Sequence, residues 1–182
     1  MAPIFSHRSP TPITTQDYRR FRPYIREDFN KCCAYCLLHE LLAGGAENFE
    51  LDHFKPKSQY PDLTYVYENI YYSCHPCNNI KHDIWPTDEL RAKGYRFVDP
   101  CHDDFSTHFT EVDGRWEPLT PAGDYSQERL RLNREHLIKI RQMLVQMLNK
   151  LGAPPLDWNQ PLKQQIAQLM HIISDSYIGS LK

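Results

Sequence analysis

Two cysteine pairs constrain the fold of this chain more than any other feature. Cys33 pairs with Cys36, and Cys74 pairs with Cys77, each across two intervening residues. A turn of this kind presents two thiolates on one side, and two such turns supply the four soft ligands of a closed, tetrahedral structural zinc site. We therefore expect a zinc ion here. The long segment between the pairs must then fold as an insertion whose ends meet at the metal.

The composition limits the class of protein and its compartment. Of 182 residues, 41% are hydrophobic and 24% charged, which is typical of one soluble globular domain. No apolar run approaches the ~20 residues of a membrane helix, and the N-terminal stretch lacks the apolar core of a signal peptide. We therefore expect a cytoplasmic protein in which CxxC pairs bind metal, and in which Cys32 and Cys101 are buried thiols. A formal net charge of -2 means that nucleic-acid binding would need locally concentrated charge.

The N-terminal part is expected to be a flexible arm followed by helices. Residues 1–14 are rich in Pro, Ser and Thr, and apolar residues at helical spacing follow from Tyr18 to Phe29. Pro23 interrupts this run, which predicts two short helices or one kinked helix. The arginines on its polar side form either a solvated face, which is the simpler reading, or a strip that faces phosphates; they are Arg19, Arg20, Arg22 and Arg26.

Short strands are expected around the second half of the insertion and beyond it. The residues from Phe49 to His53 suggest a strand ended by Pro56, and residues 65–72 suggest a strand or a short helix. A helix is expected to start around residues 77–82. Residues 95–100 suggest another strand, and residues 108–119 a hairpin that turns at Asp113-Gly114.

The C-terminal third suggests helices. Leucines recur every seven residues from Leu130 to Leu151, which predicts one long helix over residues 126–151. A second apolar stripe follows over residues 162–177. A helical hairpin that packs on itself or on the core is the simplest account. The alternative is a docking face for another subunit, such as a homodimer through the seam at residues 130–151.

Three polar residues within and beside the insertion suggest chemistry. Asp52 and Asn78 offer hard oxygen ligands, which suit Mg²⁺ or Mn²⁺. The imidazole of His53 can take a proton from water near pH 7. Together these groups are the parts needed for metal-assisted phosphodiester hydrolysis. An Asp-His pair alone would be an ordinary structural pair, so the argument depends on the spacing of the whole set.

That spacing resembles the HNH endonuclease family over roughly residues 29–100. The motif runs Asp52-His53-x-x-Pro56, then Asn69, then Cys74-x-x-Cys77-Asn78-x-x-Lys81. The resemblance implies an α+β fold with a ββα-metal core, in which two antiparallel strands, a loop and a helix surround one divalent ion. The four cysteines match the zinc-binding subset of the family.

The resemblance also implies roles for individual residues. His53 would be the general base, Asp52 and Asn78 the ligands of the catalytic Mg²⁺ or Mn²⁺, and Asn69 the residue that holds the loop and orients the base. Basic residues near the motif are candidates for contacts to the substrate: Lys55, Lys57 and Lys81 to phosphate, and His82 to phosphate or metal. The alternative for the three lysines is that they are solvated surface residues. Position 82 departs from the family pattern, in which glycine commonly follows the lysine.

The expected organisation is an arm (1–14), an HNH nuclease domain with the zinc site (15–120) and a C-terminal helical region (121–182) that packs on the core or docks a partner.

The first functional hypothesis is a DNA endonuclease. Segments around its motif look like those of a bacterial subgroup, some members of which accompany ATPases in Septu- or retron-type anti-phage systems. The alternative is a zinc-stabilised module that binds nucleic acid or protein without cutting. A CxxC thiol oxidoreductase would need a βαβ context, which the sequence does not show.

Overall fold

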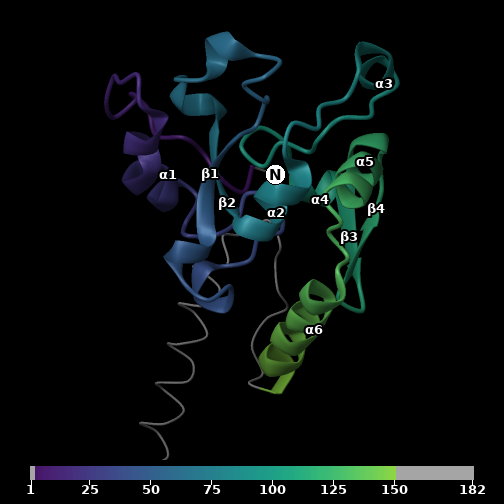
Figure 1. The fold of residues 1–182 in the computed structure, drawn as a ribbon. Coiled ribbons are helices and arrows are strands. Elements are labelled where there is room, and N and C mark those ends of the chain that lie inside the picture. The colour runs from purple at the N-terminus through teal and green to yellow at the C-terminus, as the bar shows by residue number, and fades with distance from the viewer. Residues whose placement is uncertain (1–2, 151–182) are drawn as a thin grey trace, which may run out of the picture.

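Two short antiparallel hairpins organise the α+β fold in the computed structural model, which describes residues 3–150 (Figure 1). Strand β1 (Phe49–His53) pairs with β2 (Ile70–Cys74), and β3 (Phe109–Val112) pairs with β4 (Arg115–Pro118). The helices are α1 (Arg22–Asp28), α2 (His75–Lys81), α3 (Asp88–Ala92), α4 (Phe105–His108), α5 (Pro121–Arg129) and α6 (Glu135–Lys150). No helix in this described range is long and apolar enough to cross a bilayer.

The first hairpin and α2 form the expected ββα unit. The two strands pair along their full length, from Phe49 opposite Cys74 to His53 opposite Ile70. All five residues of β2 are buried, which suits its β-branched and aromatic side chains. Helix α2 follows β2 without a loop, and Pro76 occupies its first turn, where the missing N–H is not needed. The strand carrying Asp52 and the helix carrying Asn78 therefore lie side by side (Figure 1).

The N-terminal segment packs against this unit. A 3₁₀ turn, η1 (Tyr18–Phe21), leads into α1 with Pro23 in its first turn, as the interrupted pattern predicts. Ile4 and Phe5 are buried, and the Phe5 amide donates to the Pro100 carbonyl at 3.0 Å. The beginning of the expected flexible arm is thus part of the core, because its two apolar side chains gain burial there.

Residues 95–100 are not the strand that the sequence suggests. Phe97 and Val98 are buried as a strand would require, but the Val98 amide donates to Ser126 Oγ at 2.7 Å instead of to a partner strand. The predicted hairpin is present. Asp113 (φ +49°) and Gly114 (φ +78°) both adopt the left-handed conformation that a type I′ turn requires.

The single helix expected over residues 126–151 is wrong, because the chain breaks between α5 and α6. Arg131 adopts φ +50°, and the Asn133 amide bonds both the backbone N–H and the carbonyl of Trp116, at 2.9 and 3.0 Å. These hydrogen bonds to β4 take the place of the hydrogen bonds that a continuous helix would form.

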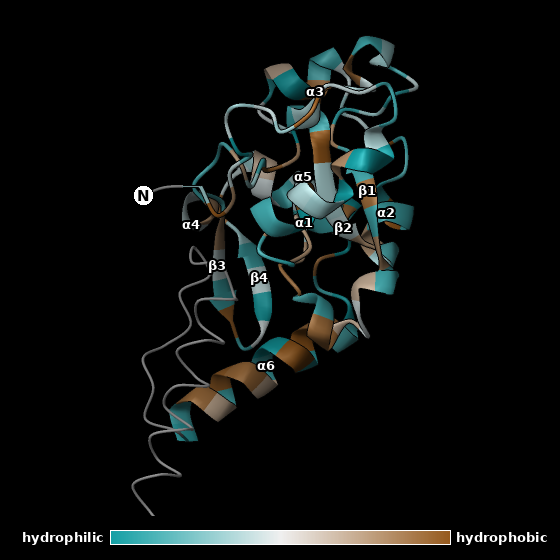
Figure 2. Ribbon diagram, turned by 90° about the vertical axis from the view of Figure 1, so that its left-hand side faces the viewer, coloured by the Kyte–Doolittle hydropathy of each residue, from teal (hydrophilic) through white to brown (hydrophobic). Residues whose placement is uncertain are grey.

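The leucine seam faces the chain's own core, since Leu130, Leu137 and Leu144 are buried. Figure 2 shows α6 crossing beside the β3–β4 hairpin. Leu151 and the second stripe lie outside the described residues.

Candidate functional site

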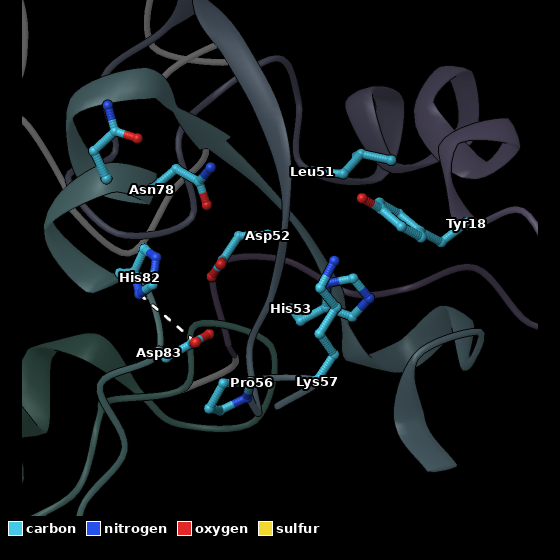
Figure 3. A pocket seen from close by; sticks show the side chains of 10 residues that line it. Tyr18, Leu51, Asp52, His53, Pro56, Lys57, Asn78, His82 and Asp83 are labelled. Carbon is cyan, nitrogen blue, oxygen red and sulfur yellow. Dashed lines mark ion pairs between the residues drawn. The ribbon is translucent and has the colours of Figure 1, made fainter. Parts of the chain in front are cut away.

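A cavity of about 250 Å³ opens between β1, α2 and η1 (Figure 3). It brings together five residues that the sequence singled out: Asp52, His53, Lys57, Asn78 and His82. The other lining residues are Tyr18, Leu51, Pro56, Asn79 and Asp83. One concave site thus holds most of the expected chemistry.

Asp52 is buried but keeps one oxygen available. Its Oδ2 accepts hydrogen bonds from the Tyr35 hydroxyl and from the Lys81 ammonium, the latter at 2.8 Å. Within residues 3–150 no hydrogen bond engages Oδ1. Burial raises the pKa of Asp52, and the Lys81 charge opposes that rise. The carboxylate is therefore held by one oxygen while the other can serve as a ligand.

Asn78 is oriented in a complementary way. Its amide Nδ2 donates to the Glu50 carboxylate, so the amide oxygen faces away from Glu50. In Figure 3 this oxygen points toward Asp52. An unpaired carboxylate oxygen and an amide oxygen that converge in one cavity are a donor set that a hard divalent cation prefers. The residues present therefore fit the divalent ion that the family resemblance implies.

Glu50 is a site residue that the sequence reasoning missed. It lies two positions before Asp52 on β1, and alternate residues of a strand share a face. Besides Asn78, its carboxylate contacts His75 Nδ1 at 3.0 Å. The signal was present in the sequence: once β1 was expected and Asp52 was placed toward α2, Glu50 had to face α2 as well.

His53 has the features of a general base. Its Nε2 lies 3.0 Å from the Thr64 carbonyl, which can only accept, so Nε2 carries the proton and Nδ1 the lone pair. No hydrogen bond from the described residues engages Nδ1. Burial lowers the pKa of His53, which keeps the ring neutral near pH 7. The Tyr18 ring packs against the imidazole in an edge-to-face arrangement, with centroids 4.7 Å apart.

Asn69 does not line the cavity but fastens the loop after β1. Its side chain accepts from the Lys55 amide at 2.9 Å and donates to the carbonyls of Lys55 and Leu63, at 3.1 and 3.3 Å. Both ends of loop 55–63 are thereby tied to the residue that immediately precedes β2. The next residue is Thr64, whose carbonyl orients His53. These contacts suit the loop-holding role that the family resemblance implies for Asn69.

The expected phosphate contacts divide into two groups. Lys81 as a phosphate contact is wrong: its side chain is 0% exposed, and it bonds Asp52 and the His53 carbonyl, the latter at 2.7 Å. Lys55 lies over the Tyr60 ring and does not line the cavity. Lys57 and the exposed His82 do line it.

The two cysteine pairs meet as expected. The Sγ atoms of Cys33, Cys36, Cys74 and Cys77 all lie within 4.8 Å of one another and are buried. The 3.8 Å between the sulfurs of Cys36 and Cys74 matches the edge of a tetrahedron with Zn–S bonds of about 2.3 Å, and far exceeds a disulfide bond. Leu37, which follows the first cysteine pair, adopts the left-handed backbone conformation (φ +61°) and reverses the chain there. These four thiols fit a structural zinc ion, whereas Cys32 and Cys101 are buried outside the cluster.

Comparison with known proteins agrees with this geometry. Residues 33–83 match the family model described as HNH endonuclease. The matched segment contains both cysteine pairs, the β1–β2 hairpin and α2. A comparison with curated proteins finds no match. The matched segment does not include η1, which contributes Tyr18 to the cavity, or the α5–α6 region.

Proposed function

Because residues 33–83 carry an HNH endonuclease domain, we propose that this chain hydrolyses phosphodiester bonds in DNA, with one divalent ion and with His53 as general base. A single observation carries the proposal. Asp52, Asn78 and the neutral ring of His53 line one open cavity. A module that only binds nucleic acid has no need of a desolvated base beside two oxygen ligands.

Asp52 and Asn78 would hold Mg²⁺ or Mn²⁺. When bound, such an ion offsets the negative charge that develops on the phosphate and on the leaving oxygen. The chain fixes both ligands in advance: Lys81 and Tyr35 hold the carboxylate, and Glu50 holds the amide. Such supporting contacts commonly govern metal affinity.

His53 would take a proton from the attacking water through Nδ1. The hydrogen bond from Nε2 to Thr64 fixes the ring and its tautomer, and remains possible when the ring becomes protonated. Lys57 and His82, at the rim of the cavity, are our candidates for phosphate contacts. A lowered pKa leaves the base unprotonated at neutral pH, where the reaction is expected to run.

Nicking of supercoiled plasmid tests the proposal. Wild-type protein should nick in Mg²⁺ or Mn²⁺ and not in excess EDTA. His53→Ala should slow nicking by about 100-fold or more, as expected for loss of a general base, with an unchanged zinc content. His102→Ala, at an exposed histidine outside the cavity, serves as the matched control. Undiminished nicking by His53→Ala would contradict the assignment.

The proposal extends to the cell. We place the chain in the cytoplasm, in anti-phage defence together with a partner ATPase. The support is the likeness of residues 52–58 and 81–86 to the corresponding segments of that bacterial subgroup. The measurement is phage plating efficiency on cells that express the chain with its neighbouring genes, compared with the His53→Ala version. Equal plating on both would refute the defence role and leave the nuclease proposal standing.

A further inference from the structure

Arg134 connects the C-terminal region to the cysteine cluster. It lies between α5 and α6, outside the segment that matches the HNH model. Its Nη2 donates to Cys77 Sγ at 3.2 Å, and its Nη1 donates to the Leu130 carbonyl at 2.9 Å. Its Nε is buried and has no hydrogen-bond partner among the described residues. The Arg134 guanidinium is thus held against Cys77 Sγ, although this position leaves its Nε without a hydrogen-bond partner among the described residues.

The charge of a zinc site explains this placement. Four thiolates around Zn²⁺ carry a net charge of about −2, which is unfavourable in a buried position unless cations or hydrogen-bond donors offset it. Arg134 supplies both a positive charge and a donor to one thiolate. Because these opposite charges lie in direct contact, zinc binding and the placement of the half-buried Arg134 stabilise each other.

Apolar contacts between the cysteine turns and α6 are incomplete. A cavity of about 290 Å³ separates them, lined on one side by Leu38, Ala43 and Cys74 and on the other by Leu137 and Ile140. Farther along, Arg141 fastens α6 to the β3–β4 turn through the Gly114 carbonyl, at 2.6 Å. Arg134 thus adds a polar contact between the start of α6 and the zinc site to the packing of the buried Leu137.

We propose that Arg134 and the zinc–thiolate cluster form a clasp. Arg134 slows the loss of zinc, and the bound zinc keeps the start of α6 against the domain. Metal occupancy is thereby coupled to the docking of a helix outside the HNH segment. This inference rests on the zinc assignment and is independent of nuclease activity, so a catalytically inactive His53→Ala background should give the same answer.

The test measures zinc release into excess chromogenic chelator. Arg134→Met keeps most of the side-chain volume without the charge, and Arg131→Met, at an exposed neighbouring arginine, is the control. Loss of a contact behind a metal ligand typically weakens metal binding by about 10- to 100-fold, so Arg134→Met should release zinc correspondingly faster. The rate of zinc release from Arg134→Lys should fall between those of Arg134→Met and wild type, because lysine keeps the positive charge but lacks the planar set of guanidinium donors.

Hydrogen exchange tests the other half of the clasp. In Arg134→Met the amides of α6 should exchange faster than in wild type, while those of β1 and β2 stay protected. Zinc release at the wild-type rate, or unchanged protection of α6, would overturn the proposal, as would wild-type protein that purifies without zinc. If Arg134→Met does not fold, the Lys variant decides, since the clasp requires it also to lose zinc faster than Arg131→Met.

Discussion

Replacing Lys81 with Met tests the claim that this lysine supports the site from within and does not contact phosphate. The ammonium makes two bonds, 2.8 Å to Asp52 Oδ2 and 2.7 Å to the His53 carbonyl, and the side chain is fully buried. Methionine nearly fills the volume but leaves the Asp52 carboxylate with the Tyr35 hydroxyl as its remaining hydrogen-bond donor among residues 3–150.

The expected magnitude follows from burial. Breaking a buried ion pair on one side costs about 3–5 kcal/mol, because an uncompensated charge remains. That is a large part of the roughly 5–15 kcal/mol that holds a domain folded. Lys93→Met is the matched control: Lys93 pairs with Glu89 at 2.8 Å on the surface, where such pairs contribute less than about 1 kcal/mol.

The sign of the pH dependence follows from Asp52. Burial already raises the pKa of this carboxyl, and loss of the Lys81 cation raises it further. A group with a raised pKa in the folded state binds protons more tightly there than in the unfolded chain. The variant therefore loses stability as pH rises. The difference in free energy of unfolding between wild type and Lys81→Met should become smaller as pH falls.

Urea unfolding of zinc-loaded protein at several pH values is the assay. The deficit of Lys81→Met should be several kcal/mol at neutral pH and should be smaller in mild acid, whereas that of Lys93→Met should stay small throughout. A Lys81→Met deficit equal to that of the control would refute the buried pair. A deficit that does not change with pH would refute the stated role of Asp52.

Three further predictions concern the reaction and the metals. Glu50→Ala should raise the Mg²⁺ concentration needed for nicking by about 10- to 100-fold, because the Asn78 amide loses its anchor; an unchanged requirement would contradict this. The nicking rate should fall on acidification with a midpoint below about 6.5, the ordinary pKa of histidine, since burial lowers the pKa of His53; a midpoint above it would contradict the assignment. Mild EDTA should stop nicking reversibly while circular dichroism stays unchanged, whereas removal of zinc should unfold the site.

Much of the site could be predicted because its chemistry is carried by residue type and local spacing. A CxxC turn needs only four residues, and β1 begins and ends where its pattern indicated, at Phe49 and His53. The Asp113-Gly114 turn was predictable for the same reason, because the left-handed backbone it requires is a property of those two residues.

The sequence by itself predicted the candidate ligands: four thiols for one metal, and Asp52, Asn78 and His53 for the proposed chemistry. Only the tertiary structure decided which other side chains serve them. Lys81 looks like any surface lysine in sequence, yet it is buried against Asp52. The helix expected over residues 126–151 breaks where Asn133 forms hydrogen bonds with Trp116, and the next residue, Arg134, donates to Cys77. The reason is physical: such partners are distant along the chain, and whether a charge is solvated or buried depends on what packs around it.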